Sequence, residues 1–291
     1  MDLDEYQRHA LATDQKAAVP GTEVLVPLLG LAGEVGELLS EYKKHLRDGE
    51  AHRLFESRVS EELGDILWYV AAVAHRFDLE LGSVATLNLK KCRSNWAPDS
   101  AKGSVHGRFD DGFPRGEQFP AKFIIDFEEL NHDEGLRVRA WLQERQMGQD
   151  LTDNAFQHDG YRFHDVFHLA CVAGLGWSPV TRRNLGLKRR SDPLIDEVED
   201  GGRATVIEEG ITALVFSYAI EHDWLEGVRR IDHDILKVIK KMTSHLEVSA
   251  CSIAEWEHTV LRAYPVWRQV LRKRGGSVEV DLESRSIRLV S

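Results

Sequence analysis

Cysteine is scarce in this chain of 291 residues, which contains only Cys92, Cys171 and Cys251 and no CxxC pair. An odd and sparse set of cysteines excludes a disulfide framework and a zinc ribbon, and it suits a reducing compartment. Long apolar runs are lacking as well, since no stretch approaches the ~20 residues that a membrane helix needs. The first segment, MDLDEYQRHALATDQK, carries charges where a signal peptide would have its apolar core. We therefore expect a cytoplasmic protein without a membrane span.

An excess of positive charge is also absent. The chain has 37 Lys and Arg residues against 48 Asp and Glu residues, which gives a formal net charge of −11. General nucleic-acid binding is not expected, because its affinity comes largely from neutralised phosphates. A nucleotide substrate remains compatible with the acidic balance, because divalent cations can bridge carboxylates to phosphates. The length and a hydrophobic content of 42% leave room for two domains, each with its own core.

The first third of the chain has the periodicity of helices. Apolar residues recur at helical spacing in four segments, at about 3–16, 27–47, 53–77 and 81–95. Four helices with short connections predict an all-α helical bundle over residues 1–97, which a partner subunit would complete if its apolar faces are too broad. Residues 98–118 are rich in Gly, Ser, Asp and Pro and lack periodicity, so they are the expected linker.

The remainder, residues 119–291, has a mixed pattern that predicts an α+β domain. Two strands are expected at 123–130 and 136–143, joined through residues 131–135. Alternating apolar residues between 278 and 289 predict a C-terminal hairpin. Helices are expected at about 160–174, 196–221, 224–246 and 253–273.

Two acidic runs stand beside the apolar stripes of the second and third expected helices. They are Glu34, Glu37 and Glu41 in GEVGELLSEYKK, and Glu61, Glu62 and Asp65 in EELGDILWYV. Within each run most of the acids are three or four residues apart and share one helix face, where like charges repel. A solvated acidic face is the ordinary explanation for one such run, whereas a bound divalent cation would explain both. Oxygen ligands alone favour Mg²⁺, with Mn²⁺ as the alternative ion.

The same segments resemble a known family. GLAGEVGELLSEYKK, followed after a modest gap by EELGDILWYV, is similar to the MazG-like all-α nucleoside triphosphate pyrophosphohydrolases. The signature of that family is ExxE, a variable spacer and ExxD, and Glu34, Glu37, Glu62 and Asp65 match it. LDEYQRHALAT and NLKKCRSNW resemble the first and last helices of the family. The resemblance spans roughly residues 1–97.

The resemblance implies hydrolysis of a nucleoside triphosphate, with ribose or deoxyribose, to the monophosphate and pyrophosphate with Mg²⁺. The four signature carboxylates would be the metal ligands. A metal-bound hydroxide, or a water activated by one of these carboxylates, would attack the α-phosphorus. Members of the family commonly form dimers or tetramers, so a homo-oligomer is expected.

Four more residues are implied to contact the substrate. Asn88, Lys91 and Arg93 align with polar and basic residues near the phosphates, and Tyr69 falls where related enzymes place an aromatic near the nucleotide. Asn95 departs from the pattern, since many relatives carry an Arg there. Lys91 and Arg93 could instead form an ordinary basic helix end, which the helix dipole favours. Tyr69 could equally be a core aromatic.

A second polar cluster lies in the C-terminal domain. His164 and His168 are four residues apart on an expected helix, a spacing that lets two imidazoles reach one metal ion. Glu208 and Glu209 follow on a later helix, and two His with carboxylates suit zinc, manganese or iron. The segment HDVFH is not the HExxH protease motif, and its apolar neighbours also allow hydrogen-bonded histidines at the edge of a core. Lys188, Arg189, Arg190 and Arg203 could receive an anion nearby.

These patterns leave three functions open. The leading hypothesis is a Mg²⁺-dependent nucleoside triphosphate pyrophosphohydrolase. The alternative is an N-terminal nucleotide sensor that regulates a C-terminal metal-dependent hydrolase centred on His164 and His168. A third hypothesis makes that histidine cluster the main active site, for phosphoester cleavage.

Overall fold

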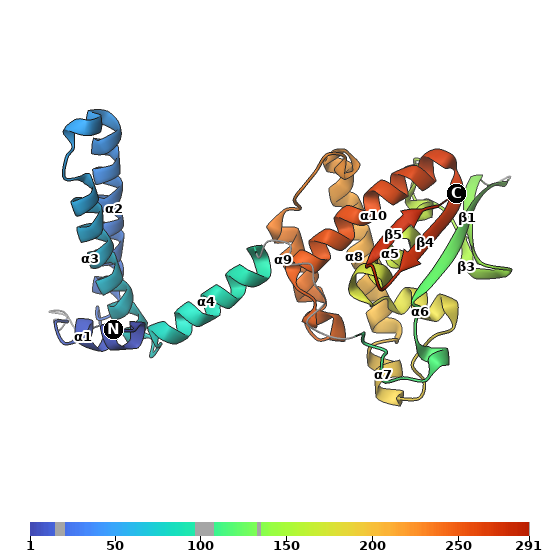
Figure 1. Cartoon of the computed structure of the whole chain (residues 1–291), viewed down its shortest axis with the longest axis horizontal. Coiled ribbons are helices and arrows are strands. Elements are labelled where there is room, and N and C mark those ends of the chain that lie inside the picture. Colours follow the sequence, from blue (N-terminus) through green and yellow to red (C-terminus); the bar gives the residue numbers. More distant parts are fainter. Residues whose placement is uncertain (15–20, 97–107, 133–134, 291) are drawn as a thin grey trace. The chain divides into compact units, whose positions relative to one another are not determined.

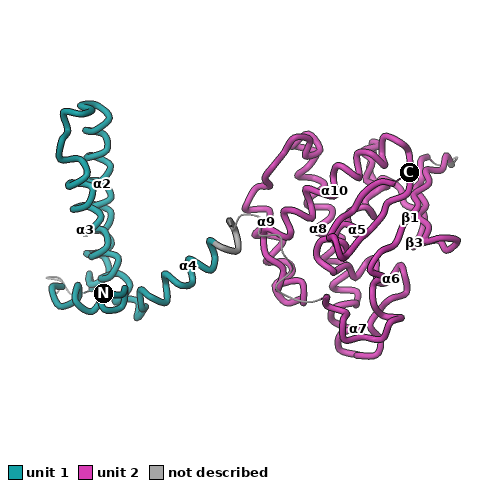
Figure 2. Tube along the Cα trace, in the orientation of Figure 1, with its two compact units in different colours: residues 1–93 teal, residues 94–291 magenta. Residues whose placement is uncertain are grey.

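The computed structural model describes residues 1–14, 21–96, 108–132 and 135–290. The chain divides into two compact units, residues 1–93 and 94–291 (Figure 2). Within the described ranges, none of the helices combines the length and the apolar character that crossing a membrane requires.

Unit 1 is all-helical in its described residues, as the sequence predicted. Its helices are α1 (Leu3–Leu11), α2 (Leu25–Asp48), α3 (Phe55–Arg76) and α4 (Leu81–Trp96), with a 3₁₀ turn at Gly49–Ala51 (Figure 1). The two long helices α2 and α3 lie side by side. Helix α1 ends at Leu11, short of the predicted residue 16. Its start is capped by Asp2, whose side chain accepts a hydrogen bond from the Glu5 N–H at 2.7 Å.

A small core forms where α1, α3 and the start of α4 meet. Its buried members are Ala10, Ala71, Ala74 and Leu81, against which Tyr6, Trp68 and Val70 pack. Gln7 reinforces the junction, because its side-chain amide donates to the Leu79 carbonyl and its oxygen accepts from the Leu81 N–H, both at 2.9 Å. Helix α4 is therefore anchored through its first turn.

Most apolar residues of α2 and α3 lie outside this core. Leu29, Leu39 and Leu46 have 62%, 64% and 69% of their surface exposed. The four helices of the predicted bundle are present, but one chain alone does not bury their apolar faces. We call the exposed residues the α2–α3 apolar surface; they are Leu25, Val26, Leu28, Leu29, Val35, Leu39, Tyr42, Leu46, Leu63 and Leu67.

Unit 2 contains a five-stranded antiparallel sheet, which confirms the predicted α+β class. The strand order is β3-β2-β1-β4-β5. The strands are β1 (Lys122–His132), β2 (Gly135–Leu142), β3 (Arg145–Leu151), β4 (Gly275–Asp281) and β5 (Ser286–Leu289). The central strand β1 pairs with β4 from Lys122 opposite Asp281 to Glu128 opposite Gly275. Both predicted hairpins form, and β3 is an additional edge strand.

Helices cover one face of this sheet. They are α5 (Asp165–Leu175), α6 (Pro179–Leu185), α7 (Pro193–Val198), α8 (Gly202–Glu221), α9 (His233–Met242) and α10 (Ile253–Lys273). Helices α5 and α10 pack on β4 and β5, and the inward residues Phe123, Ile125 and Phe127 of β1 are buried in the same core (Figure 1). Ten of the eleven residues of α5 are buried, so this helix lies at the centre of unit 2.

The predicted bounds of two helices of unit 2 were wrong. The segment expected at 196–221 is divided into α7 and α8, because the chain turns at Gly201, where a Cβ atom would lie 1.9 Å from the Glu197 carbonyl oxygen. Helix α9 begins at His233 instead of near residue 224, after a 3₁₀ turn at Asp223–Leu225. The short helix α6 was not expected; Ser178 caps it by accepting from the Thr181 N–H at 3.0 Å.

Part of the segment assigned to the linker packs onto the remainder of unit 2. Asp110 is 1% exposed and accepts hydrogen bonds from the Phe119 N–H at 2.8 Å and from the Arg182 guanidinium at 2.9 Å. A 3₁₀ turn follows at Arg115–Glu117. The linker assigned to 98–118 therefore includes residues 108–118 that are fixed by contacts with distant segments, and residues 97–107 lie outside the described part.

Candidate active site

The acidic runs of α2 and α3 meet across the two helices. Glu34, Glu62 and Asp65 each offer a carboxylate oxygen within 4.8 Å of the others. Glu34 and Glu62 are half-buried, whereas Asp65 is exposed. Three carboxylate oxygens therefore lie together on the helix pair. Mg²⁺ and Mn²⁺ prefer oxygen ligands of this kind.

The carboxylates of Glu34, Glu62 and Asp65, which we call the carboxylate cluster, lie close enough for the charges of Glu34 and Asp65 to repel that of Glu62. Burial, followed by the negative charges of Glu34 and Glu37, raises the pKa of Glu62 above its ordinary value. Glu37 is exposed and stands outside the group that lies within 4.8 Å, although its charge acts on Glu62. A divalent cation among these oxygens would lower the pKa of Glu62 again by removing the repulsion.

The two remaining acids of the runs have partners within the protein. Glu41 is buried, and its carboxylate pairs with Lys44 and with His52 Nε2, the latter at 3.1 Å. Glu61 accepts from Arg58 at 2.8 Å. These ion pairs distinguish both residues from the carboxylate cluster.

Tyr69 lies one turn after Asp65 and packs on α2 at Gly30. A Cβ atom at position 30 would lie 2.1 Å from Tyr69 Cε1, so glycine is what allows the ring to approach the helix. The ring also meets Trp68 edge-on, with centroids 5.0 Å apart. Gly33 and Gly36 have open space around a Cβ atom, so this packing does not account for them.

The predicted phosphate contacts lie on α4. Its first turn is held by Asp4, whose carboxylate accepts from the Gly82 N–H at 2.7 Å. Beyond this turn α4 runs away from the α2–α3 pair (Figure 1). Within one chain, the described contacts do not bring Asn88 and Lys91 to the carboxylate cluster. The side chain of Arg93 lies outside the described residues. The role of these three residues stays a prediction.

A second cluster of metal-ligand atoms is found in unit 2. His164 directly precedes α5, His168 lies on α5, and Glu209 lies on α8. One atom of each falls within 4.8 Å of the others. Glu209 Oε2 is 3.4 Å from His168 Nε2 and 3.8 Å from His164 Nε2. The helical spacing of the two histidines predicted their shared face, and Glu209 lies on the later helix from which a carboxylate was expected.

Glu208 has a different position from its neighbour. One of its oxygens accepts from His168 Nδ1 at 2.9 Å, and the other accepts from the Val180 N–H at 2.9 Å. It therefore supports the ring of His168 from the side opposite Nε2. The sequence alone could not divide the roles of the adjacent Glu208 and Glu209.

Sequence reasoning missed a buried network of ion pairs in unit 2. Arg189 is 1% exposed and donates to Asp200 at 2.7 Å and 3.2 Å and to Glu247 at 2.7 Å and 2.9 Å. Its pairing with these internal carboxylates corrects the expectation that Arg189 receives an external anion. Burial alone would raise the pKa of Asp110, but hydrogen bonds with the Phe119 N–H, Arg108 and Arg182 hold it below its ordinary value. The ion pairs of Asp110 with Arg182 and of Arg189 with Asp200 and Glu247 join residues that are 72, 11 and 58 positions apart, so no spacing rule predicts the network.

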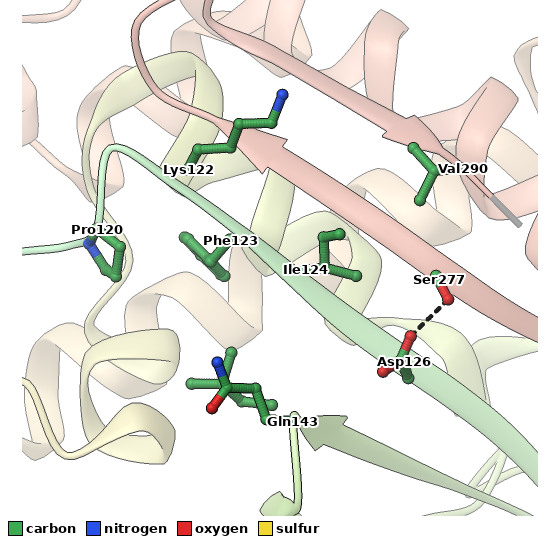
Figure 3. A pocket seen from close by; sticks show the side chains of 9 residues that line it. Pro120, Lys122, Phe123, Ile124, Asp126, Gln143, Ser277 and Val290 are labelled. Atoms are coloured by element: carbon green, nitrogen blue, oxygen red, sulfur yellow. Dashed lines mark hydrogen bonds between the residues drawn. The ribbon is translucent and has the colours of Figure 1, made fainter.

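A pocket on the open face of the sheet has a volume of about 810 Å³ (Figure 3). Its lining includes Ile124, Gln143 and Val290, together with one carboxylate, Asp126, which accepts a hydrogen bond from Ser277 (Figure 3). A single carboxylate that is already hydrogen-bonded gives this pocket less catalytic potential than either cluster.

Comparison with known proteins covers both units. The sequence model of the MazG nucleotide pyrophosphohydrolase domain matches residues 24–95, and that of the MazG C-terminal domain matches residues 104–291. The chain is 33% identical over 120 residues to the Gene 37 protein of Mycobacterium phage L5, an alignment that covers 38% of this chain and 99% of that relative. No solved structure matches the chain. The first matched range contains the carboxylate cluster, and the second contains the histidine cluster.

Proposed function

The chain belongs to the MazG family, and from this premise we propose that unit 1 hydrolyses a nucleoside triphosphate to a monophosphate and pyrophosphate with Mg²⁺. Membership of the family suggests nucleotide pyrophosphohydrolase activity. One observation supports hydrolysis that depends on Mg²⁺. Carboxylate oxygens of Glu34, Glu62 and Asp65, which are inside the matched range, lie within 4.8 Å of one another.

In this proposal the protein supplies the metal ligands. Glu34, Glu62 and Asp65 would hold Mg²⁺, with Glu37 completing the set, and Mn²⁺ could replace it. The bound ion would neutralise the phosphate oxygens and orient the attacking water. Attack at the α-phosphorus breaks its bond to the oxygen that bridges to the β-phosphate, so pyrophosphate is the leaving group. Tyr69 would contact the nucleotide beside this cluster.

We further propose that the active protein is a homo-oligomer. The α2–α3 apolar surface is exposed within one chain, and exposed apolar patches of this kind mark sites of protein association. A second copy would cover it and complete the helical core. In such an assembly Asn88, Lys91 and Arg93 would reach the phosphates from α4 of the same or of a neighbouring copy.

The location that suits this proposal is the cytoplasm. The three cysteines are unpaired in the structure, and two of them, Cys171 and Cys251, are buried. Free thiols are the usual state in a reducing compartment.

The direct test is to incubate the purified chain with a panel of ribo- and deoxyribonucleoside triphosphates and Mg²⁺ and to measure pyrophosphate. We expect release from at least one nucleotide, and its loss in Asp65→Asn with the fold intact. Glu56→Gln, which changes an exposed carboxylate at the start of α3, is the matched control and should keep near-normal turnover. Near-normal turnover of Asp65→Asn would remove the metal assignment.

The second candidate function is the nucleotide sensor that regulates unit 2. The observation that favours it is the histidine cluster, a group of metal-ligand atoms outside the carboxylate cluster. Nucleotide binding without pyrophosphate release in the same assay would support the sensor and refute the enzyme hypothesis.

A further inference from the structure

His164, His168 and Glu209 bring three donor atoms together at the centre of unit 2. His168 is 1% exposed and His164 is 6% exposed, and Glu209 approaches them from the facing helix α8. Two imidazole nitrogens and one carboxylate oxygen form a set that transition-metal ions bind in proteins.

Hydrogen bonds at the far side of each ring fix which nitrogen faces the cluster. His164 Nδ1 lies 2.8 Å from the Tyr161 carbonyl oxygen, which can only accept, so Nδ1 carries the proton. His168 Nδ1 likewise donates to Glu208 at 2.9 Å. In the neutral form of each ring, Nε2 then carries the lone pair, and both Nε2 atoms lie within 3.8 Å of Glu209 Oε2. Metal-binding histidines are typically held in this way by a carbonyl or carboxylate on the other ring nitrogen.

His168 Nε2 is buried and forms no hydrogen bond in the described structure, although Glu209 Oε2 lies 3.4 Å away. Buried polar atoms are almost always satisfied, and an exception calls for a bound ion, a water molecule or a functional role. On the opposite side of the ring, Glu208 accepts from His168 Nδ1 and also from the Val180 N–H. The unsatisfied atom therefore indicates a ligand at this point of the cluster.

One separation between donor atoms matches that expected for a tetrahedral ion, and a second is slightly longer. Two ligand atoms at about 2.1 Å from zinc and at the tetrahedral angle lie about 3.4 Å apart. His168 Nε2 and Glu209 Oε2 are 3.4 Å apart. His164 Nε2 is 3.8 Å from the same oxygen, so it would move closer by roughly 0.4 Å on binding. The Glu209 side chain is 38% exposed, which leaves the cluster accessible from the solvent.

We propose that unit 2 binds a zinc ion through His164, His168 and Glu209, with Glu208 as a positioning residue for His168. Zinc is favoured over manganese and iron by the general order of affinity for nitrogen-containing sites. Three protein ligands leave a fourth position for water or a substrate atom, which is the arrangement of hydrolytic zinc sites.

The competing explanation is an ion triad without metal. In that case His168 would carry a proton on both nitrogens and lie between Glu208 and Glu209. The two explanations differ in what they require of Glu209, since a zinc site loses a ligand when this carboxylate becomes an amide, whereas a metal-free triad has no zinc affinity to lose.

The test uses the full chain without a histidine tag, stripped with EDTA and titrated with Zn²⁺ against a coloured chelator in excess Mg²⁺. The excess of Mg²⁺ would compete with Zn²⁺ for the all-oxygen cluster of unit 1, so that the titration reports on the histidine cluster. We expect one zinc per chain. Glu208→Gln should weaken zinc binding about 10- to 100-fold, and Glu209→Gln, which removes a ligand, should weaken it more than about 100-fold.

Glu221→Gln changes an exposed carboxylate on the same helix α8 and serves as the control, with unchanged affinity expected. Equal zinc affinity in the unaltered chain and in Glu209→Gln would overturn the proposal, as would no binding by the unaltered chain. If a variant fails to fold, Co²⁺ added to the unaltered chain gives an independent result. A tetrahedral cobalt spectrum supports the site, and an octahedral one refutes it. Neither readout depends on nucleotide hydrolysis by unit 1.

Discussion

The buried cation Arg189 offers the sharpest test of what stabilises unit 2. Its guanidinium makes four hydrogen bonds to Asp200 and Glu247, between 2.7 Å and 3.2 Å, and a fifth to the Phe109 carbonyl at 3.0 Å. Arg189→Met keeps an unbranched side chain but removes the charge and every donor. Asp200, which is 2% exposed, and Glu247 would then lose their shared cation.

Removal of one partner from a buried ion pair costs about 3–5 kcal/mol, because the remaining charge stays desolvated. Unit 2 spans residues 94–291. For a domain of this size, 1 kcal/mol corresponds to roughly 2–4 °C in the melting temperature, so a decrease of about 6–20 °C is expected.

Differential scanning calorimetry of the full chain measures this decrease in the transition that belongs to unit 2. The matched control is Arg190→Met, which changes an exposed arginine next to it and should alter the stability by no more than about 0.5 kcal/mol. If Arg189→Met melts within 2 °C of the unaltered chain, about what 1 kcal/mol or less would produce, the network does not stabilise unit 2 as argued.

Three further predictions concern packing, acid stability and assembly. Gly30→Ala places a Cβ atom against Tyr69 and should lower the free energy of unfolding by about 1–3 kcal/mol. Gly33→Ala, where a Cβ atom has open space, should stabilise α2 by up to about 1 kcal/mol. Urea unfolding measures both changes, and equal effects of the two variants would contradict the packing of Tyr69 on Gly30. Because the pKa of Asp110 is lowered in the fold, its contribution to stability is present above its unfolded pKa of about 3.9 and is lost as the pH falls. Asp110→Asn should therefore be less stable at pH 7 and lose less stability on acidification, and an unchanged pH profile of unfolding would refute this. Leu29→Glu introduces a charge into the α2–α3 apolar surface and should shift the protein to smaller species in light scattering at equal concentration; an unchanged mass would exclude this surface as the interface.

The helices of unit 1 could be predicted because their information is local. The apolar stripe of α2 repeats every three or four residues, and each acidic run lies on one helix face for the same reason. What the sequence could not supply was the distance between runs on different helices. In the structure Glu34 lies within 4.8 Å of Glu62 and Asp65, and Glu37 is outside this group.

Unit 2 was harder to predict because its signals are short or nonlocal. Strand β3 (Arg145–Leu151) reads RQMGQDL, a polar edge segment with an internal glycine and little alternation. Helix α6 has only seven residues, too few for a periodic pattern, although Ser178 and Pro179 are a typical helix start. The ion pairs of Arg189 connect parts of the chain that no spacing rule relates. The helical spacing of His164 and His168, by contrast, was sufficient to predict that they share a face.

The strand order of unit 2 also determines when this protein can finish folding. Lys122 at the start of the central strand pairs with Asp281, so that ladder cannot close until the chain has been synthesised to that point. At the usual 5–20 residues per second the delay is about 8–30 s. During this time one edge of β1 has no partner, and an unpaired strand edge is prone to aggregation. The helices of unit 1 depend on nearby residues and can form while synthesis continues. A truncation shortly before β4 would therefore be expected to leave unit 1 helical and to make unit 2 insoluble.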